Sequence, residues 1–316
     1  MKIVVLDGYT LNPGDLDWSL IKAFGDTTIY ERTPCHLTVQ RIGDAQIVLT
    51  NKTILSREVL SFCPSVQYIG VLATGYNVVD TVYAKEKGIV VTNIPSYATE
   101  SVAQHTMALL LELTNHVGLH AESVRNGVWT SSPDFSYQLS PLCDLAGKTM
   151  GIIGCGSIGK AVARIAAAFG MRILAYTRTP FTDDRIICCD LQTILSESDV
   201  ITLHCPLTDT NREIINADTI SKMKTGAFLI NTARGGLVNE AALSDALNNG
   251  KLGGAAADVV SLEPIAADNP LLGAKNMYIT PHNAWASKES RMRLMHTAAE
   301  NIEKFLSGKP QNVVNL

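Results

Sequence analysis

Short runs of apolar, β-branched residues recur along the first hundred positions of the chain. They read IVVL at 3–6, AQIVLT at 45–50, VQYIGVL at 66–72 and GIVVTN at 88–93, and segments of helical character separate them. Near-continuous apolar runs are typical of strands that are buried on both faces of a parallel sheet. This part of the chain is therefore predicted to form βαβ units.

A second series of strand-like runs begins after residue 148, behind a polar segment that contains proline. A long helix rich in small and apolar residues is expected before that segment, at 100–118, and a charged amphipathic helix near the end, at 287–307. The alternation of strands and helices again predicts a parallel sheet. The runs of this second series lie at 149–154, 172–176, 199–205, 227–232 and 277–280.

A glycine-rich turn joins the first strand of the second series to the helix that follows. The sequence GIIGCGSIGK places Gly154, Gly156 and Gly159 in the pattern GxGxxG. Between a strand and a helix, this pattern is typical of a loop that binds the pyrophosphate of a dinucleotide. Backbone N–H groups at the start of the helix, at Ser157 and Ile158, are expected to bind the negative charge. The alternative is an ordinary βα turn with glycines by chance.

The position of this loop in the middle of the chain predicts an inserted domain. A complete α/β unit precedes the loop, which leaves the last helix free to return to that unit. The expected fold class is α/β, with two doubly wound parallel sheets. Residues 101–287 are predicted to form a Rossmann dinucleotide-binding domain, inserted into a flavodoxin-like substrate-binding domain of residues 1–100 and 288–316. The two crossings between the domains are expected to form a hinge.

The stretch that follows the next strand bears on the choice of cofactor. An acidic residue about 20 positions after the glycine loop usually binds the adenine ribose of NAD. Here the chain has Thr177, Arg178 and Thr179, and no acid until Asp183. A guanidinium attracts a 2′-phosphate, and the threonine hydroxyls can donate to it. The stretch therefore favours NADP(H), with NAD(H) or dual use as the alternative.

Three polar residues follow strands or loops later in the second series. Arg234 lies in NTARGGLVNE, Glu263 in ADVVSLEP and His282 in ITPHNAWAS. Ligands of an open α/β sheet bind outside the carboxyl ends of its strands. Arginine can hold a carboxylate and polarise a neighbouring carbonyl, histidine can donate a proton, and glutamate can orient the imidazole. Each residue taken alone could also be a solvated surface charge or a satisfied polar group.

Composition and charge argue against several classes of protein. The chain has 316 residues, of which 46% are hydrophobic and 18% charged, and a net charge of −4. This charge gives no electrostatic argument for binding nucleic acid or an anionic membrane. No apolar run approaches the roughly 18 residues of a membrane span, and Asp7 comes too early for a signal peptide. We expect a cytoplasmic protein.

The cysteines and histidines give no metal pattern. The seven cysteines contain no CxxC pair, which indicates neither a zinc site nor a disulfide framework. His116 and His120 could form a pair on a helix, but no further ligand completes a site. No metal is expected.

These motifs, in this order and spacing, resemble the D-isomer-specific 2-hydroxyacid dehydrogenase family over nearly the whole chain. Within the family, VVLDGYTLNPGDLDW and VLATGYNVVD are most similar to the glycerate dehydrogenase (hydroxypyruvate reductase) group. The segments that carry the resemblance are ATGYNVVD (73–80), GIIGCGSIGKAVARIAAAFGM (151–171), LHCPLTDTNREIIN (203–216), FLINTARGGLVNEAAL (228–243), GGAAADVVSLEP (253–264) and YITPHNAWAS (278–287).

The resemblance implies a role for each candidate residue. Arg234 would bind the substrate carboxylate and carbonyl, Glu263 would be the partner of the histidine, and His282 would be the acid/base. The backbone amides of Thr74 and Gly75 would complete the carboxylate site. The positions that match the family's cofactor site are Thr99, His204, Cys205, Pro206, Thr210, Thr232, Ala233, Asp258, His282 and Ala284, with Asp258 facing the nicotinamide amide.

The resemblance also bears on neighbouring branches and on assembly. Related formate dehydrogenases pair the histidine with glutamine, so Glu263 argues against that branch. The family's usual NAD-type acid stands where this chain has Thr177, so the departure concerns the cofactor and leaves the reaction unchanged. A homodimer is implied, through the helix that starts near residue 101 and the arm near 120–145.

The expected activity is the NAD(P)H-dependent reduction of a small 2-oxo acid. Hydroxypyruvate would give D-glycerate and glyoxylate would give glycolate, with no part for nucleic acid or membrane. One alternative is the same chemistry on a bulkier 2-oxo acid or on a phosphoglycerate. Another is a non-catalytic, NAD(H)-sensing protein similar to transcriptional co-repressors, because a fold does not fix a function.

Overall fold

The computed structural model describes residues 1–316, and the chain divides into two compact units. One unit contains Met1–Ala98 and Ala286–Leu316, and the other contains Thr99–Trp285. The first unit is therefore discontinuous in sequence, and the second is inserted into it. Each unit has its own parallel sheet with helices around it.

The sheet of the first unit has the strand order β2-β1-β3-β4-β5, and all of its neighbouring strands are parallel. This is the order of the flavodoxin-like doubly wound fold. Its strands are β1 (Lys2–Val5), β2 (Asp26–Ile29), β3 (Ile47–Thr50), β4 (Tyr68–Val71) and β5 (Val90–Thr92). Its helices are α1 (Ser19–Lys22), α2 (Thr38–Ile42), α3 (Arg57–Ser61), α4 (Thr81–Glu86) and α11 (Lys288–Leu306), with short 3₁₀ turns η1 (Gly8–Thr10) and η2 (Cys35–Leu37).

The C-terminal part of the chain completes the first unit. Helix α11 packs against this sheet, where the ring of Phe305 lies 4.8 Å from the buried ring of Tyr68. Beyond the helix, Val313 forms an antiparallel bridge with Thr92 on the edge strand β5. Because an uncovered edge strand leaves backbone groups unpaired, this tail protects the sheet.

The sheet of the second unit has the order β12-β11-β10-β9-β6-β7-β8 and is also parallel throughout. The order reverses between β6 and β9, as in a Rossmann fold. Its strands are β6 (Thr149–Ile153), β7 (Arg172–Tyr176), β8 (Ile186–Cys188), β9 (Val200–Leu203), β10 (Ala227–Asn231), β11 (Leu252–Ala257) and β12 (Met277–Ile279). The predicted fold class, with two doubly wound parallel sheets, is confirmed.

Helices cover both faces of this second sheet. One buried core contains residues of α5 and α7, and another on the opposite face contains residues of α8, α9 and α10. Helix α7 is rich in alanine, which lets it lie close to its neighbours. The helices are α5 (Thr99–Asn115), α6 (Val117–Arg125), α7 (Ser157–Ala168), α8 (Leu191–Glu197), α9 (Ala217–Lys222) and α10 (Glu240–Asn248), with 3₁₀ turns η3 (Trp129–Ser131), η4 (Gly235–Leu237) and η5 (Pro270–Gly273).

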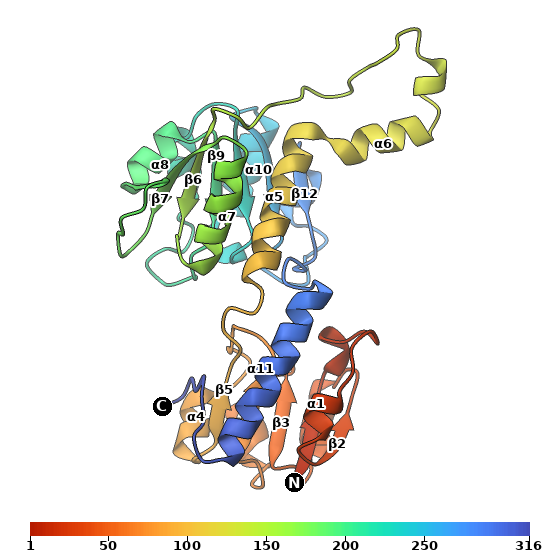
Figure 1. The fold of residues 1–316 in the computed structure, drawn as a ribbon, viewed down its shortest axis with the longest axis vertical. Helices are drawn as coiled ribbons and strands as arrows, with labels where there is room; N and C mark the ends of the chain where they lie inside the picture. The colour runs from red at the N-terminus through yellow and green to blue at the C-terminus, as the bar shows by residue number, and fades with distance from the viewer. The chain divides into compact units, whose positions relative to one another are not determined.

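The long helix predicted at 100–118 ends earlier than expected. Helix α5 ends at Asn115, because His116 adopts a left-handed conformation with φ of 48°. That conformation cannot continue a right-handed helix. A separate helix, α6, then leads into an arm that extends away from the sheet of its own unit (Figure 1).

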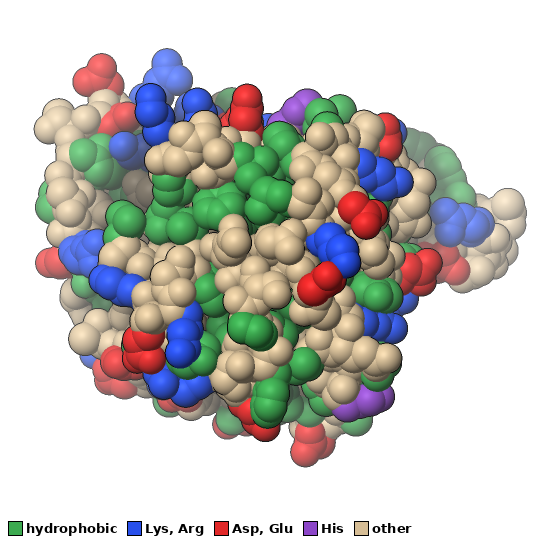
Figure 2. Space-filling model, turned by 90° about the horizontal axis from the view of Figure 1, so that it is seen from below, with side chains coloured by type: hydrophobic (Ala, Val, Ile, Leu, Met, Phe, Trp, Pro, Cys, Tyr) green, Lys and Arg blue, Asp and Glu red, His purple; other side chains and the backbone are tan.

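Charges of both signs are interspersed on the protein surface. Figure 2 shows Lys and Arg side chains mixed with Asp and Glu side chains on the face in view, with hydrophobic side chains between them. None of the helices combines the length and apolar character that crossing a bilayer requires.

Candidate active site

The candidate catalytic residues follow the carboxyl ends of three neighbouring strands of the second sheet. Strands β10, β11 and β12 are neighbours and run parallel, so their carboxyl ends lie side by side. Arg234 follows β10, Glu263 follows β11 and His282 follows β12. Three residues that are far apart in sequence therefore come from adjacent loops of one edge, where ligands of such sheets bind.

His282 and Glu263 form a direct hydrogen bond. His282 Nδ1 lies 2.6 Å from Glu263 Oε2, and the other carboxylate oxygen accepts from the Val260 N–H at 3.2 Å. Since an ionised carboxylate can only accept, the histidine proton belongs on Nδ1. Both side chains are about one-third exposed, at 32% and 37%. This arrangement leaves His282 Nε2 free to exchange a proton with a ligand.

A buried carboxylate anchors the loop that carries His282. Asp258 is 1% exposed, and its oxygens accept from the backbone N–H of Asn283 and of Ala284, each at 2.9 Å. The Thr280 hydroxyl donates to the same carboxylate at 2.6 Å. These bonds fix the turn in which His282 adopts φ of 53°.

Asp258 therefore has a role in the structure that the sequence did not suggest. Its three donors come from the His282 loop, and His105 of α5 lies 3.0 Å from the Thr280 hydroxyl. The expected contact of Asp258 with a nicotinamide amide stays a prediction. The group formed by buried Asp258 with half-buried Thr280 and His105 was not predicted, because its members are far apart in sequence.

Arg234 presents a largely free guanidinium at the same edge. Its side chain is exposed, and only Nη1 is engaged, in a bond to the Ala233 carbonyl at 2.7 Å. The next residue must be glycine, because a Cβ at Gly235 would lie 1.9 Å from the Val260 carbonyl carbon. This close approach packs the loop of Arg234 directly against the loop of Glu263.

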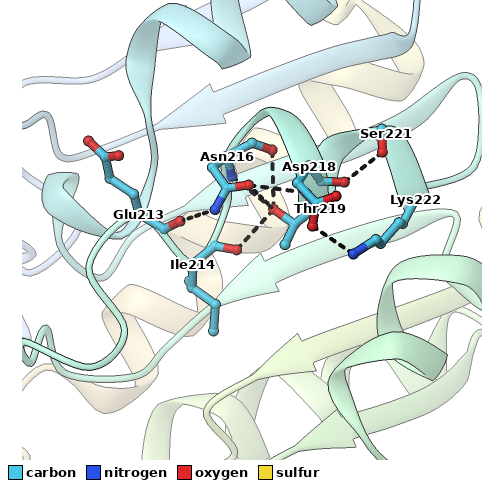
Figure 3. A network of polar contacts seen from close by, with 7 residues as sticks. All are labelled: Glu213, Ile214, Asn216, Asp218, Thr219, Ser221 and Lys222. Atoms are coloured by element: carbon cyan, nitrogen blue, oxygen red, sulfur yellow. Dashed lines mark hydrogen bonds and ion pairs between the residues drawn. The ribbon is translucent and has the colours of Figure 1, made fainter.

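A network of helix-capping hydrogen bonds supports the segment that follows Arg234. Asn216 and Thr219 form a capping box at the start of α9, and Asn216 also binds the Glu213 carbonyl at 2.8 Å (Figure 3). Glu213 N–H in turn donates to the Gly236 carbonyl at 2.9 Å. Glu213 lies in the loop between β9 and α9, so the network connects this loop to the turn that follows Arg234 and holds that turn in place.

The glycine loop has the geometry expected of a pyrophosphate site. Gly154 has φ of +94°, and a Cβ there would lie 2.5 Å from the backbone nitrogen of Cys205. At Gly156, by contrast, a Cβ would meet nothing within 4 Å, so the backbone is open to a ligand. Ser157 and Ile158 begin α7. The residues present therefore fit a bound dinucleotide.

The stretch after β7 lies at the same edge, beside the glycine loop. Gly154 N–H donates to the Tyr176 carbonyl at 2.9 Å, which ties the loop to the end of β7. Arg178 and Thr179 are exposed, and Thr177 is half-buried. The Arg178 guanidinium forms no hydrogen bond or ion pair within the chain, so it is available to a ligand.

The other expected cofactor residues fall into two groups. In the first group, the Thr232 hydroxyl lies 3.5 Å from His204 Nδ1 and 3.0 Å from the Thr106 hydroxyl. His204 Nε2 lies 2.9 Å from the Thr202 hydroxyl. Burial lowers the pKa of His204 to about 3, so its imidazole is neutral, and burial raises the pKa of the Cys205 thiol. The remaining members are Ala233, half-buried, Ala284, buried, Pro206 and Thr210, exposed on the loop after β9, and Thr99, the first residue of α5.

In the first unit, the expected carboxylate-binding residues lie in the loop that follows β4. Thr74 is exposed and Gly75 is half-buried. The Thr74 hydroxyl donates to the Ile94 carbonyl at 2.8 Å. The backbone N–H groups of Thr74 and Gly75 donate to no acceptor in the chain, which leaves both free for an anion. No group of three or more His, Cys, Asp or Glu side chains is placed to hold a metal ion.

Comparisons with known proteins identify relatives of the chain. Residues 107–284 match the family model described as D-isomer specific 2-hydroxyacid dehydrogenase, NAD binding domain. Hydroxypyruvate reductase of Blautia hydrogenotrophica is 54% identical over all of both chains. Glycerate dehydrogenase of Methylorubrum extorquens is 46% identical over 87% of each chain. The crystal structure of an NADPH-dependent glyoxylate/hydroxypyruvate reductase from Sinorhizobium meliloti is 30% identical, with a TM-score of 0.85 over 99% of this chain and 97% of that one.

Proposed function

The chain belongs to the D-isomer specific 2-hydroxyacid dehydrogenase family, and from this premise we propose that it reduces hydroxypyruvate and glyoxylate with NAD(P)H. The products would be D-glycerate and glycolate. It is an NAD(P)-dependent oxidoreductase acting on small 2-oxo acids, as the relatives named for that activity indicate. The hydrogen bond of 2.6 Å between His282 and Glu263 is the observation that carries the proposal.

In this proposal His282 donates the proton that the substrate oxygen needs. A bound NAD(P)H supplies the hydride that reduces C2. As negative charge develops on the carbonyl oxygen, His282 Nε2 protonates it, and the Glu263 carboxylate stabilises the imidazolium that precedes this transfer. The free Nε2 and the engaged Nδ1 support these roles.

Arg234 is proposed to bind the substrate carboxylate and polarise the adjacent carbonyl. A planar guanidinium can form two parallel, charge-assisted hydrogen bonds with a carboxylate. The free backbone N–H groups of Thr74 and Gly75 are proposed to bind the same carboxylate. The domain of residues 1–100 and 288–316 would then be the substrate domain.

Initial rates with different 2-oxo acids test the proposal. Hydroxypyruvate and glyoxylate should be reduced with higher kcat/KM than pyruvate or phenylpyruvate, and hydroxypyruvate should give D-glycerate. Higher kcat/KM for phenylpyruvate would point to a bulkier substrate. The absence of turnover on every 2-oxo acid, together with tight dinucleotide binding, would favour the sensing alternative.

We propose that NADP(H) is the preferred cofactor and that Arg178 binds its 2′-phosphate. Replacing Arg178 with alanine should then raise the KM for NADPH by about 10- to 100-fold, because one charge-assisted contact to phosphate is lost. The KM for NADH should change little, since NADH carries no 2′-phosphate. Steady-state rates with both cofactors make the measurement.

The nearby Arg185 offers a matched control for Arg178. It is exposed on the same part of the chain, before β8, and an Arg185→Ala variant should keep the wild-type cofactor preference. An equal loss with NADH and NADPH in the Arg178 variant would contradict the 2′-phosphate contact. A wild-type preference for NADH would do so as well.

We propose a homodimer formed through α5, the helix that starts near residue 101, and through the arm near 120–145, which includes the end of α6. The arm exposes large apolar side chains, including Phe135 at 90% and Trp129 at 50%. Exposed apolar side chains that lie close together are typical of protein interfaces. Light scattering should give twice the chain mass of 34.1 kDa, and a Phe135→Asp variant should shift the mass toward the monomer.

Phe62 is a suitable control for the arm, because it is 65% exposed but lies at the end of α3 in the other unit. Phe62→Asp should leave the mass unchanged. A monomeric wild-type protein at micromolar concentration would overturn the proposed dimer.

A further inference from the structure

A buried carboxylate organises one loop of the first unit. Asp7, just after β1, is 4% exposed. It accepts from the backbone N–H groups of Asn51 at 2.8 Å, Lys52 at 2.6 Å and Thr53 at 2.7 Å, and from the Thr53 hydroxyl at 3.0 Å. A buried carboxylate is costly unless it is hydrogen-bonded, so these donors fix the loop after β3 against the end of β1.

Asn51 connects the loop after β3 to the end of the neighbouring strand, β4. Its side-chain Nδ2 donates to the Leu72 carbonyl at 2.6 Å, and the Leu72 N–H donates to the Thr50 carbonyl at 2.8 Å. The peptide groups on both sides of Leu72 are therefore held by the segment that Asp7 organises. Leu72 directly precedes the loop that contains Thr74 and Gly75.

The segment that follows β5 also holds this loop. Asn93 Nδ2 donates to the Thr74 carbonyl at 2.7 Å, and the Thr74 hydroxyl donates to the Ile94 carbonyl at 2.8 Å. The loop is thus fixed by its carbonyl groups, while its N–H groups at Thr74 and Gly75 stay unpaired. A pair of oriented, unpaired amides is suited to a carboxylate.

Asn51 is not the residue that stability alone would favour. Its side chain is buried, at 3% exposure, and its Oδ1 has no hydrogen-bond partner. A buried acceptor without a partner destabilises a fold. Such a group calls for an explanation beyond packing.

We propose that Asn51, itself fixed by Asp7, is a positioning residue that sets the Thr74 and Gly75 amides for the substrate carboxylate. The inference rests on the proposed function of these two amides. Asn51 acts through the Leu72 carbonyl and touches no substrate. Its removal should therefore weaken the binding of carboxylates and leave the dinucleotide site of the other unit unaffected.

The test replaces Asn51 with leucine, which is similar in size and has no donor. We expect the KM for hydroxypyruvate and the Ki for oxamate, an unreactive carboxylate analogue, to rise together by about tenfold or more, because small displacements of binding groups have large effects. The Kd for NADPH should stay at its wild-type value. If Asn51→Leu does not fold, Asn51→Ala, which also lacks the donor, serves for the same comparison.

Asn12 gives a matched control in the same unit. It is also buried, and its Nδ2 donates to the Leu16 carbonyl at 2.6 Å, but it has no bond to the loop after β4. Asn12→Leu should lower the melting temperature without changing KM or Ki. An Asn51→Leu variant that behaves in the same way would overturn the positioning role.

Hydrogen exchange separates this inference from the proposed function. The N–H groups of Leu72 and Ile94, which donate to the Thr50 and Ala73 carbonyls, should exchange faster in Asn51→Leu than in the wild type, and unchanged exchange would contradict the inference. That result does not depend on turnover. A wild-type protein that reduces no 2-oxo acid would instead count against the proposed function.

Discussion

Replacement of His282 by alanine is expected to lower kcat by about 10²- to 10⁴-fold, the usual contribution of a general acid. The bond of 2.6 Å to Glu263 holds the imidazole with Nε2 free, so its loss removes the proton donor for the substrate oxygen. The glycine loop and Arg178 are untouched by the change. The Kd for NADPH should therefore stay within about twofold of the wild type.

Two further variants make this result specific. His296 is exposed on α11, and His296→Ala should retain wild-type kcat. Glu263→Gln keeps a hydrogen-bond acceptor for Nδ1–H but removes the negative charge, so its kcat should fall less than that of His282→Ala. Near-wild-type turnover in His282→Ala would rule out His282 as the acid/base.

Replacement of Arg234 by glutamine is expected to lower kcat/KM for hydroxypyruvate by about 10²-fold or more, comparable with the loss of an oxyanion donor. The exposed guanidinium has most of its donors free. It would both bind the carboxylate and stabilise charge on the carbonyl oxygen, so KM should rise and kcat should fall. Steady-state kinetics at saturating NADPH separate the two effects.

Arg234→Lys distinguishes charge from geometry. Lysine keeps the positive charge but lacks the planar fork, so it should recover part of the affinity and little of kcat. Arg185→Gln, an exposed arginine elsewhere in the unit, should have no effect. If Arg234→Gln keeps wild-type kcat/KM, another group binds the carboxylate.

The strands of the sheets were predictable to different degrees. Runs of apolar, β-branched residues indicated β1, β3, β4, β5 and most strands of the second sheet, whereas β2, β8 and β11 were missed. Strand β11 reads LGGAAA and has little intrinsic strand propensity. Its small residues are required by packing: a Cβ at Gly254 would lie 2.8 Å from the Leu113 side chain of α5. Tertiary contacts therefore decide this strand.

The candidate site shows the same division. The glycine loop, Arg234, Glu263 and His282 could be proposed from motifs at strand ends, and their roles remain predictions. The groups that hold them could not be found this way. Asp7 and Asn51 are joined across 44 positions, and Asp258 binds residues 25 and 26 positions away. Local patterns carry no information on such pairings, because only the completed sheet brings the partners together.

The order of strands along the carboxyl edge of the second sheet has a consequence for evolution. The loops of Arg234, Glu263 and His282 follow β10, β11 and β12, whereas the residues expected to select the cofactor follow β7, across β9 and β6. Mutations that change the dinucleotide can accumulate at one end of this edge without disturbing the proton donor at the other. Lineages that keep one reaction could therefore exchange NADH for NADPH as metabolism demands, and engineers could do the same with few substitutions around Arg178.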